Sequence, residues 1–167
     1  MFVRERFEKD HEPLFERRNM GTTIWSPLAG GILTGKYNDG NIPEGSRVEL
    51  MYKTGGHLAK RADAYFAPEN KDKFVKVVTA LGDYAKELGY TQAQLALAWS
   101  VATKDTSTAI LGFSRLSQID ENLGAISLVE KWTPEIEKKC NEILGNCPTL
   151  EMCWRTWATP LPRRLRC

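Results

Sequence analysis

The sequence predicts an α/β protein that contains a parallel sheet. Two short runs rich in β-branched and apolar residues, Thr22–Trp25 and Thr108–Gly112, are typical of strands. Segments with apolar residues at three-to-four spacing precede, separate and follow these runs, and strands that alternate with helices favour parallel pairing. Because two strands are too few to form a sheet that is stable alone, we expect one part of a larger α/β fold.

The first 56 residues are predicted to form a charged helix, the first strand and a long loop. Residues 2–18 have the pattern of an amphipathic helix, although Pro13 interrupts it, and Gly21 ends the pattern. Residues 26–56 are rich in Gly, Pro, Ser and Asn, which predicts a loop, and we interpret a loop of this length as functional. The helix is expected to contact the core through Phe2, Phe7, Leu14 and Phe15.

Helices dominate the rest of the predicted fold. Lys71–Leu88 has apolar residues at helical spacing and is followed by Gly89, a favourable helix end. Thr91 and Gln94 have the spacing of a capping box, which predicts the start of a second, more buried helix. Two further helices are predicted over residues 117–126 and 133–144.

Composition and charge argue against several classes of function. A net charge of +2 and a pI of 8.3 give no argument for binding nucleic acid. The N-terminal ten residues are too charged for a signal peptide, and no run approaches the roughly 18 to 20 apolar residues of a membrane span. We therefore expect a cytoplasmic protein that neither binds nucleic acid nor inserts into a membrane.

The end of the chain differs in composition from the rest. All the cysteines lie in the last 28 residues without a CxxC pair or a nearby His, so we predict reduced thiols and no metal site, with a terminal disulfide as the alternative. Residues 147–167 hold three Pro, two Trp and four Arg, and they are predicted to be a disordered tail, with membrane or nucleic-acid contact as the alternative. The cysteines are Cys140, Cys147, Cys153 and Cys167.

Each predicted strand is followed by a turn that suits a phosphate. In Trp25–Gly31, glycine lets backbone N–H groups approach a diphosphate closely, and a serine hydroxyl adds a donor. Lys36 and Arg47 can supply cations from the long loop. After the second strand, Gly112 permits close approach, and Ser114 lies near the start of a helix whose dipole favours a phosphate.

The helix after the second turn adds polar side chains. Gln118, Glu121 and Asn122 follow at helical spacing, and their face could bind adenine and a ribose or its phosphate. Either turn alone is an ordinary loop or cap, but their joint occurrence favours a nucleotide cofactor. Phosphate sites of (β/α)8 barrels often form at the last two strand ends, and a whole barrel typically needs about 250 residues. The prediction is therefore the C-terminal portion of a (β/α)8 (TIM) barrel, incomplete as a barrel.

Catalytic residues are not predicted in this chain. His11 lies in the charged helix and His57 in the glycine-flanked loop, and neither has a nucleophile or carboxylate partner nearby in sequence. We interpret both as surface histidines.

Several segments together resemble the C-terminal half of an aldo-keto reductase, in the branch that contains the β-subunits of voltage-gated potassium channels. The resemblance covers roughly residues 1–147. The segments that carry it are TTIWSPLAGGILTGKY, GNIPEGSR, YTQAQLALAWSVA, AILGFSRLSQIDENLGAI and TPEIEKKCNEILGN.

The resemblance implies a role for each turn in binding NADPH. Trp25 would stack beside the nicotinamide, and Lys36 and Arg47 would contact phosphates in a loop that folds over the cofactor. A contact to the 2′-phosphate implies NADPH rather than NADH. The diphosphate would be lined by Ser26, Pro27, Leu28, Ala29 and Gly30; the 2′-phosphate end by Gly112, Ser114 and Gln118; and the adenine by Glu121 and Asn122.

The resemblance also implies what this sequence lacks. The family's catalytic Asp, Tyr, Lys and His lie on the first four strands, whereas this chain starts after the sixth. Lys36 and Tyr37 match two of these residue types but not their positions, so they are not substitutes. Gly45 stands where channel β-subunits carry an aromatic residue, which implies looser cover over the cofactor.

Three functions follow as alternatives. The first is the cofactor-binding half of an NADPH-dependent reductase of aldehydes or ketones, over residues 1–146, inactive alone. The second is a non-catalytic NADPH-binding regulatory subunit of the potassium-channel β type, with a membrane channel or a second copy of the chain as partner. The third is a truncated gene product without activity.

Overall fold

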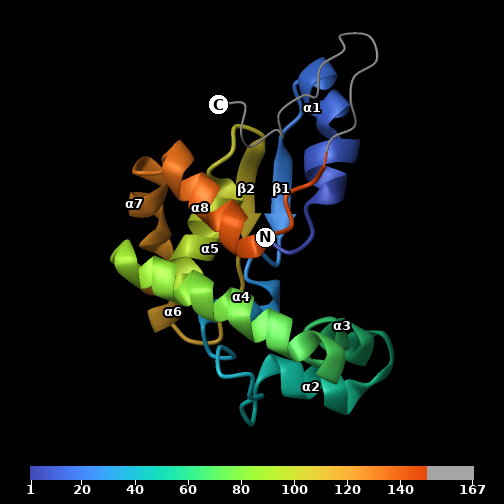
Figure 1. The fold of residues 1–167 in the computed structure, drawn as a ribbon. Coiled ribbons are helices and arrows are strands. Elements are labelled where there is room, and N and C mark those ends of the chain that lie inside the picture. Colours follow the sequence, from blue (N-terminus) through green and yellow to red (C-terminus); the bar gives the residue numbers. More distant parts are fainter. Residues whose placement is uncertain (150–167) are drawn as a thin grey trace.

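The structure, a computed structural model, describes residues 1–149, so the predicted tail lies outside the described residues from position 150 onward. Two strands, β1 (Thr22–Trp25) and β2 (Thr106–Ile110), pair in parallel and lie side by side (Figure 1). Helices connect and surround them. In chain order, the described helices are the π-helix η1 (Arg6–Asp10), α1 (Glu12–Arg18), the 3₁₀-helix η2 (Ala29–Thr34), α2 (Arg47–Thr54), α3 (Gly56–Phe66), α4 (Pro68–Glu87), α5 (Gln92–Val101), α6 (Ser117–Leu123), α7 (Ala125–Glu130) and α8 (Pro134–Leu144).

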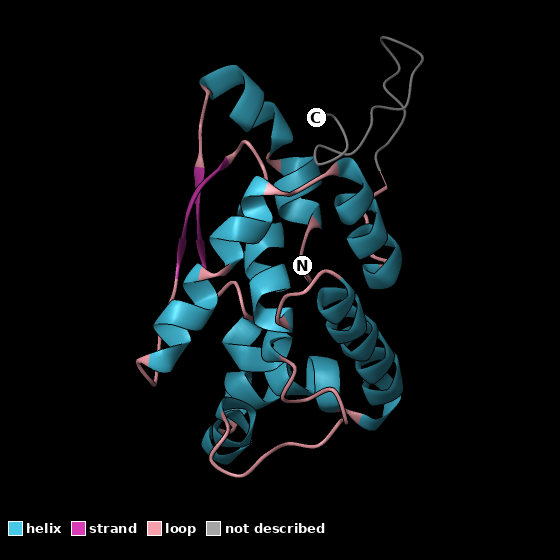
Figure 2. Ribbon diagram, turned by 90° about the vertical axis from the view of Figure 1, so that its left-hand side faces the viewer, coloured by secondary structure: helices cyan, strands magenta, loops and turns pink. Residues whose placement is uncertain are grey.

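The two-stranded sheet has one covered face and one open face. Ile24 and Ala109 are register partners and are half-buried, and α5 packs against β2. The next pair, Trp25 and Ile110, points the other way, with 71% and 57% of each residue exposed. Figure 2 shows the strands at one margin of the molecule and most helices to the other side. Within residues 1–149, the face that bears Trp25 and Ile110 is open to solvent.

The predicted mixture of helices and strands and the parallel pairing are confirmed. The first strand has the predicted bounds, whereas the second begins and ends two residues earlier than predicted. Thr106 joins the ladder because it pairs with Thr22, and the ladder ends where Ile110 pairs with Trp25. The open two-strand sheet is consistent with part of a (β/α)8 barrel, which remains a prediction in its details.

Local capping signals explain the helices that were predicted correctly. The capping box at the start of α5 is present, since Gln94 N donates to Thr91 Oγ1 at 3.2 Å and Thr91 N donates to Gln94 Oε1 at 2.9 Å. Thr133 caps α8 through the Ile136 N–H. The helix α4 starts at Pro68, three residues before the predicted start, because proline is compatible with the first turn.

The helix predicted over residues 117–126 is instead two helices. The Gln94 side chain fills the space beside Gly124, and its Nε2 donates to the Glu121 carbonyl at 2.7 Å. In a continuous α-helix that carbonyl would accept from residue 125. The chain therefore ends α6 at Leu123 and restarts as α7.

The prediction of one long loop over residues 26–56 is wrong. η2 and α2 lie inside it, and α3 begins at its end and contains His57, so this histidine is helical rather than in a loop. Ser46 starts α2 by accepting from the Glu49 N–H at 3.3 Å, a local signal that composition alone hides.

The N-terminal segment is attached to the fold by polar as well as apolar contacts. Phe2 packs near Tyr65 and Phe74, and Phe15 is buried, as expected. Leu14 is 49% exposed, so its predicted core contact is wrong. A single helix over 2–18 is also wrong, because a π-helix and a short α-helix stand in its place.

A buried ion pair joins the two ends of the described chain. Arg4 and Glu8 are 3% and 1% exposed, and the guanidinium forms two hydrogen bonds of 2.7 Å to the carboxylate. The same guanidinium donates to Asn141 Oδ1 at 2.7 Å and lies 5.3 Å from the centre of the Trp99 ring. This network connects the N-terminal segment to α5 and α8.

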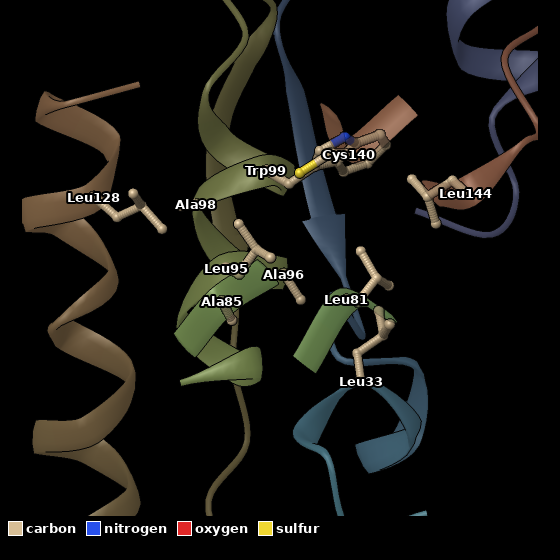
Figure 3. Packing of buried hydrophobic residues seen from close by; sticks show 10 residues of the cluster. All are labelled: Leu33, Leu81, Ala85, Leu95, Ala96, Ala98, Trp99, Leu128, Cys140 and Leu144. Atoms are coloured by element: carbon tan, nitrogen blue, oxygen red, sulfur yellow. The ribbon is translucent and has the colours of Figure 1, made fainter. Parts of the chain in front are cut away.

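The apolar core has two adjoining parts. The main cluster lies between α4, α5, α7 and α8, and Figure 3 shows Leu33 of η2 beside Leu81 of α4 within it. The second cluster joins the loop after η2 to α2, α3 and α4 through Tyr37, Val48 and Phe74. Both clusters anchor the segment between β1 and α3, which carries the first predicted phosphate turn.

We expect Glu8→Gln to lower the free energy of unfolding by about 3 kcal/mol, because it leaves the buried Arg4 charge without its carboxylate. Asp83→Asn is the matched control: the Asp83–Lys86 pair is exposed, and its loss should cost under about 1 kcal/mol. Denaturant unfolding of the 167-residue chain measures both. Equal effects of the two substitutions would contradict the structural role of Arg4 and Glu8.

Candidate functional site

The two predicted phosphate turns begin next to each other. Trp25 ends β1 and Ile110 ends β2, and these two residues are partners in the parallel register. The carboxyl ends of paired parallel strands share one edge of the sheet, which is where α/β proteins commonly bind ligands. The turns that follow, at Ser26–Gly31 and Gly112–Ser114, therefore start from adjacent positions although more than eighty residues separate them.

The first turn has an unusual backbone that the core holds in place. Ser26 and Ala29 have φ values of 57° and 51°, a region that costs energy for residues other than glycine. Gly30 and Gly31 continue it with φ values of 71° and 94°. Pro27 is buried, and Leu28 and Ala29 pack against the main core cluster. Strain that the surrounding structure maintains in this way is typical of ligand-binding turns.

Two cationic side chains lie against the consecutive glycines of this turn. The Lys36 Nζ is 3.1 Å from the position that a Cβ would occupy on Gly31. The Arg47 Cδ and Nε are 3.6 and 3.8 Å from the corresponding position on Gly30. Both residues are exposed, and the Lys36 ammonium also lies 5.0 Å from the centre of the Tyr37 ring. The turn is therefore a glycine surface with two positive charges beside it.

The start of α2 positions Arg47. Arg47 is the first residue of α2, directly after the Ser46 cap. The Glu49 carboxylate accepts from the Gly45 N–H at 2.8 Å and pairs with Lys53 at 2.8 Å, which fixes the residues on both sides of the cap. The hydrogen bond from Lys53, and then that from Gly45, lower the pKa of Glu49, so this carboxylate keeps its charge to lower pH than an ordinary glutamate.

In the second turn a side chain accepts from the donors that were assigned to a phosphate from the sequence. Gln118 Oε1 accepts from Ser114 N at 2.9 Å, from Ser114 Oγ at 3.2 Å and from Arg115 N at 3.3 Å. The Gln118 amide oxygen thus accepts from three donors of this turn. Gly112 is exposed, and a Cβ there would meet nothing within 4 Å, so its surroundings are open.

The remaining two predicted residues differ in accessibility. Glu121 is exposed, and its backbone carbonyl accepts from Gln94. Asn122 is buried, with 8% exposed. A hollow of about 320 Å³ is lined by residues of the second turn, of α6 and of the segment between them: Phe113, Ser114, Arg115, Leu116 and Ile119.

Other candidate groups lie apart from these turns. His11 and His57 are exposed. The Tyr37 ring is fully buried, with its centre 5.4 Å from that of Phe66, so its hydroxyl is out of reach of a substrate in solution. Cys147 is a free thiol, and Cys153 and Cys167 lie outside the described residues. In residues 1–149, no group of three His, Cys, Asp or Glu side chains is placed to hold a metal ion, and no helix has the length and hydropathy to cross a membrane.

Some residues of the candidate site were not identified from the sequence. Ser46 and Glu49 have the spacing of a capping box, so the sequence contained a signal for the start of α2 beside Arg47. Gln94 was assigned only to a cap, yet it also contacts the helix after the second turn. No local pattern predicts that contact, because 27 residues separate Gln94 from Glu121.

The fold and the site together define a class of protein: an α/β protein with glycine turns at adjacent ends of parallel strands. Comparison with known proteins gives the family. The family model described as "Aldo/keto reductase family" matches residues 1–142, and the chain belongs to this family. The resemblance that the sequence motifs predicted is therefore confirmed.

Curated relatives are similar over almost all of the chain. A protein of Schizosaccharomyces pombe that bears the name of a voltage-gated potassium channel subunit beta is 45% identical over 92% of this chain and 42% of its own length. Similarly named proteins of Arabidopsis thaliana and of Oryza sativa subsp. japonica are 40% and 38% identical over 89% of this chain and 42% of their own lengths. The chain thus spans about two fifths of these relatives.

We expect Gly31→Ala to destabilise the fold by roughly 1 to 2 kcal/mol, because its φ of 94° disfavours a side chain and the new Cβ would displace the Lys36 ammonium. Gly112→Ala is the control, since its Cβ would enter open space, and its effect should stay within about 0.5 kcal/mol. Thermal or denaturant unfolding distinguishes the two. A Gly31→Ala variant as stable as the parent would contradict the described turn.

Proposed function

We propose that this chain is the cofactor-binding C-terminal half of an NADPH-dependent aldo-keto reductase, which acts on aldehydes or ketones. One observation carries the proposal: Lys36 and Arg47 lie against Gly30 and Gly31 at the end of a strand whose parallel partner leads into a second polar turn. Two cations beside the backbone of consecutive glycines suit a diphosphate. Family membership supports the same cofactor class.

Each part of the candidate site would hold one part of NADPH. Trp25 is exposed on the open face of the sheet, where a large ring is available to stack beside the nicotinamide. Ser26–Gly30 would line the diphosphate with Lys36 and Arg47 as its cationic partners. When bound, the cofactor supplies a hydride to a carbonyl, and the chain described here orients it.

The second turn would hold the adenosine end. The N–H groups of Ser114 and Arg115 already converge on Gln118 Oε1, so a 2′-phosphate would take the place of this amide oxygen while the Gln118 NH₂ group turns toward it. Gly112 leaves room for close approach. Glu121 is accessible to an adenine amino group, whereas Asn122 would need a small movement of α6 because it is buried.

A second function is favoured by the names of the relatives. Three relatives bear the name of a potassium channel subunit beta. A non-catalytic NADPH-binding regulatory subunit, cytoplasmic and assembled with a membrane channel or with copies of itself, would use the same cofactor site. Co-purification of a channel with the protein in its longest expressed form supports this function, and recovery of the reductase activity alone opposes it.

The proposed domain covers residues 1–146. A truncated product without activity is the remaining alternative. Sequencing of the transcript tests this alternative. Codons upstream of Met1 that encode the rest of the barrel would show that the domain extends beyond this chain.

We expect the chain to bind NADPH more tightly than NADH, and Lys36→Met and Arg47→Met each to weaken NADPH binding roughly tenfold by removing one charge-assisted contact. Lys104→Met is the matched control, because this exposed lysine precedes β2 and so lies at the opposite end of the strand from the turns. Fluorescence titration with NADPH measures all three. Equal losses for Lys36→Met and Lys104→Met would count against the diphosphate site.

We expect no carbonyl-dependent oxidation of NADPH by the purified 167-residue chain, because none of its residues corresponds to the family's catalytic set and the Tyr37 hydroxyl is buried. The measurement is the loss of NADPH absorbance in the presence of an aldehyde. Turnover that survives removal of contaminating reductases would refute this expectation.

A further inference from the structure

Three side chains form a polar cluster away from the cofactor turns. Tyr90 lies between α4 and α5, Ser127 lies in α7, and Lys131 follows α7. The Ser127 Oγ is 3.2 Å and the Lys131 Nζ is 3.3 Å from the Tyr90 hydroxyl oxygen. Ser127 and Lys131 therefore converge on the phenol oxygen of Tyr90, although they lie 37 and 41 positions after it in the sequence.

The fold holds this arrangement in place. The Tyr90 ring packs against the main core cluster, and the Tyr90 N–H donates to the Ala85 carbonyl at 2.9 Å. Ser127 Oγ is also 2.9 Å from the Gly124 carbonyl, and the Lys131 ammonium lies 5.8 Å from the centre of the Tyr90 ring. The apolar part of the tyrosine is thus fixed, and its hydroxyl lies among exposed groups at the surface.

The electrostatic environment favours the ionised phenol. The hydrogen bond with Ser127 and, next, that with Lys131 lower the pKa of Tyr90, while Glu130 acts against them. The Lys131 ammonium donates to the phenol oxygen and stabilises negative charge on it, whereas the single proton of Ser127 goes either to this oxygen or to the Gly124 carbonyl. Activation of a nucleophile by a neighbouring cation follows the same logic in enzymes.

The other four tyrosines lack this environment. Tyr37 is fully buried. Burial raises the pKa of Tyr65 and of Tyr84. Tyr52 is exposed, whereas Tyr90 is half-buried. The Tyr52 hydroxyl donates to the Asp63 carboxylate at 3.0 Å, and burial and then this hydrogen bond raise the pKa of Tyr52. Tyr52 is therefore an internal control with the opposite charge beside its phenol.

We infer that Tyr90 is a nucleophilic tyrosine and a site of covalent O-acylation by activated acyl esters. In this step the phenol gives its proton to solvent, and the phenolate oxygen attacks the acyl carbon. A new C–O ester bond forms, and the bond to the leaving group breaks, with the leaving group departing as its anion. The Lys131 ammonium stabilises the phenolate throughout, and the Ser127 hydroxyl turns its single proton from the Gly124 carbonyl to the phenolate. Neither residue belongs to the proposed NADPH site.

The test uses p-nitrophenyl acetate on the whole chain without NADPH. Peptide mapping by mass spectrometry gives the rate of acetylation at each tyrosine, and we expect Tyr90 to react roughly tenfold faster than Tyr52, since one charge-assisted hydrogen bond is worth about that factor. In guanidinium the two rates should become equal. Equal rates in the folded chain would overturn the inference.

Variants test the roles of the neighbours. Lys131→Gln should lower the Tyr90 rate roughly tenfold while leaving the Tyr52 rate unchanged, and Lys131→Arg should retain most of the rate because it keeps the positive charge. Ser127→Ala should lower the rate by a smaller factor. A Lys131→Gln variant with an unchanged Tyr90 rate would also overturn the inference, and circular dichroism shows that each variant is folded.

Discussion

The parallel pairing of β1 with β2 is the constraint on which the proposed site depends. Its register places Trp25 opposite Ile110, so two turns that are distant in sequence leave the sheet side by side. A shift of one residue would turn every side chain of one strand to the other face and move the turns apart. α5 packs against β2 and stabilises the pair of strands from one side. The cap at Thr91 fixes where this helix begins.

The rest of the molecule supports the two turns unequally. The first turn is held by the core through Leu28 and Ala29, and its two cations come from a segment fixed by the second core cluster and by the Ser46 cap. The second turn is held mainly by Gln118, whose amide oxygen accepts three hydrogen bonds there and which the proposed cofactor would displace. The first turn is thus the preformed part of the site and the second is the adjustable part. Among residues 1–149, the open sheet face and the unpaired strand edges agree with a chain that spans about two fifths of its curated relatives.

Local signals in the sequence were sufficient for part of this fold. The caps at Thr91 and Thr133 and the β-branched run at Thr22–Ile24 predicted their elements, since each signal acts within four residues. The family was predicted from the resemblance of whole segments such as TTIWSPLAGGILTGKY, and the match of the family model confirms it. α2 was missed because the glycines and prolines around it hid the cap at Ser46.

Contacts between distant residues could not be predicted. The buried Arg4 donates to Asn141, which is 137 positions away, so no local pattern in the charged N-terminal segment predicts its burial. The same limit applies to Gln94 beside Glu121 and to Lys131 beside Tyr90. The use of Gln118 as an internal ligand for the second turn was likewise visible only in three dimensions.

The most direct test of this account is a titration of the isotopically labelled chain with NADPH, followed by the backbone amide signals in NMR spectra. The account predicts concerted changes at Gly30 and Gly31 in the first turn and at Gly112 and Ser114 in the second, with one dissociation constant for both. Changes confined to one turn, or located elsewhere in the chain, would contradict a shared cofactor site at the paired strand ends.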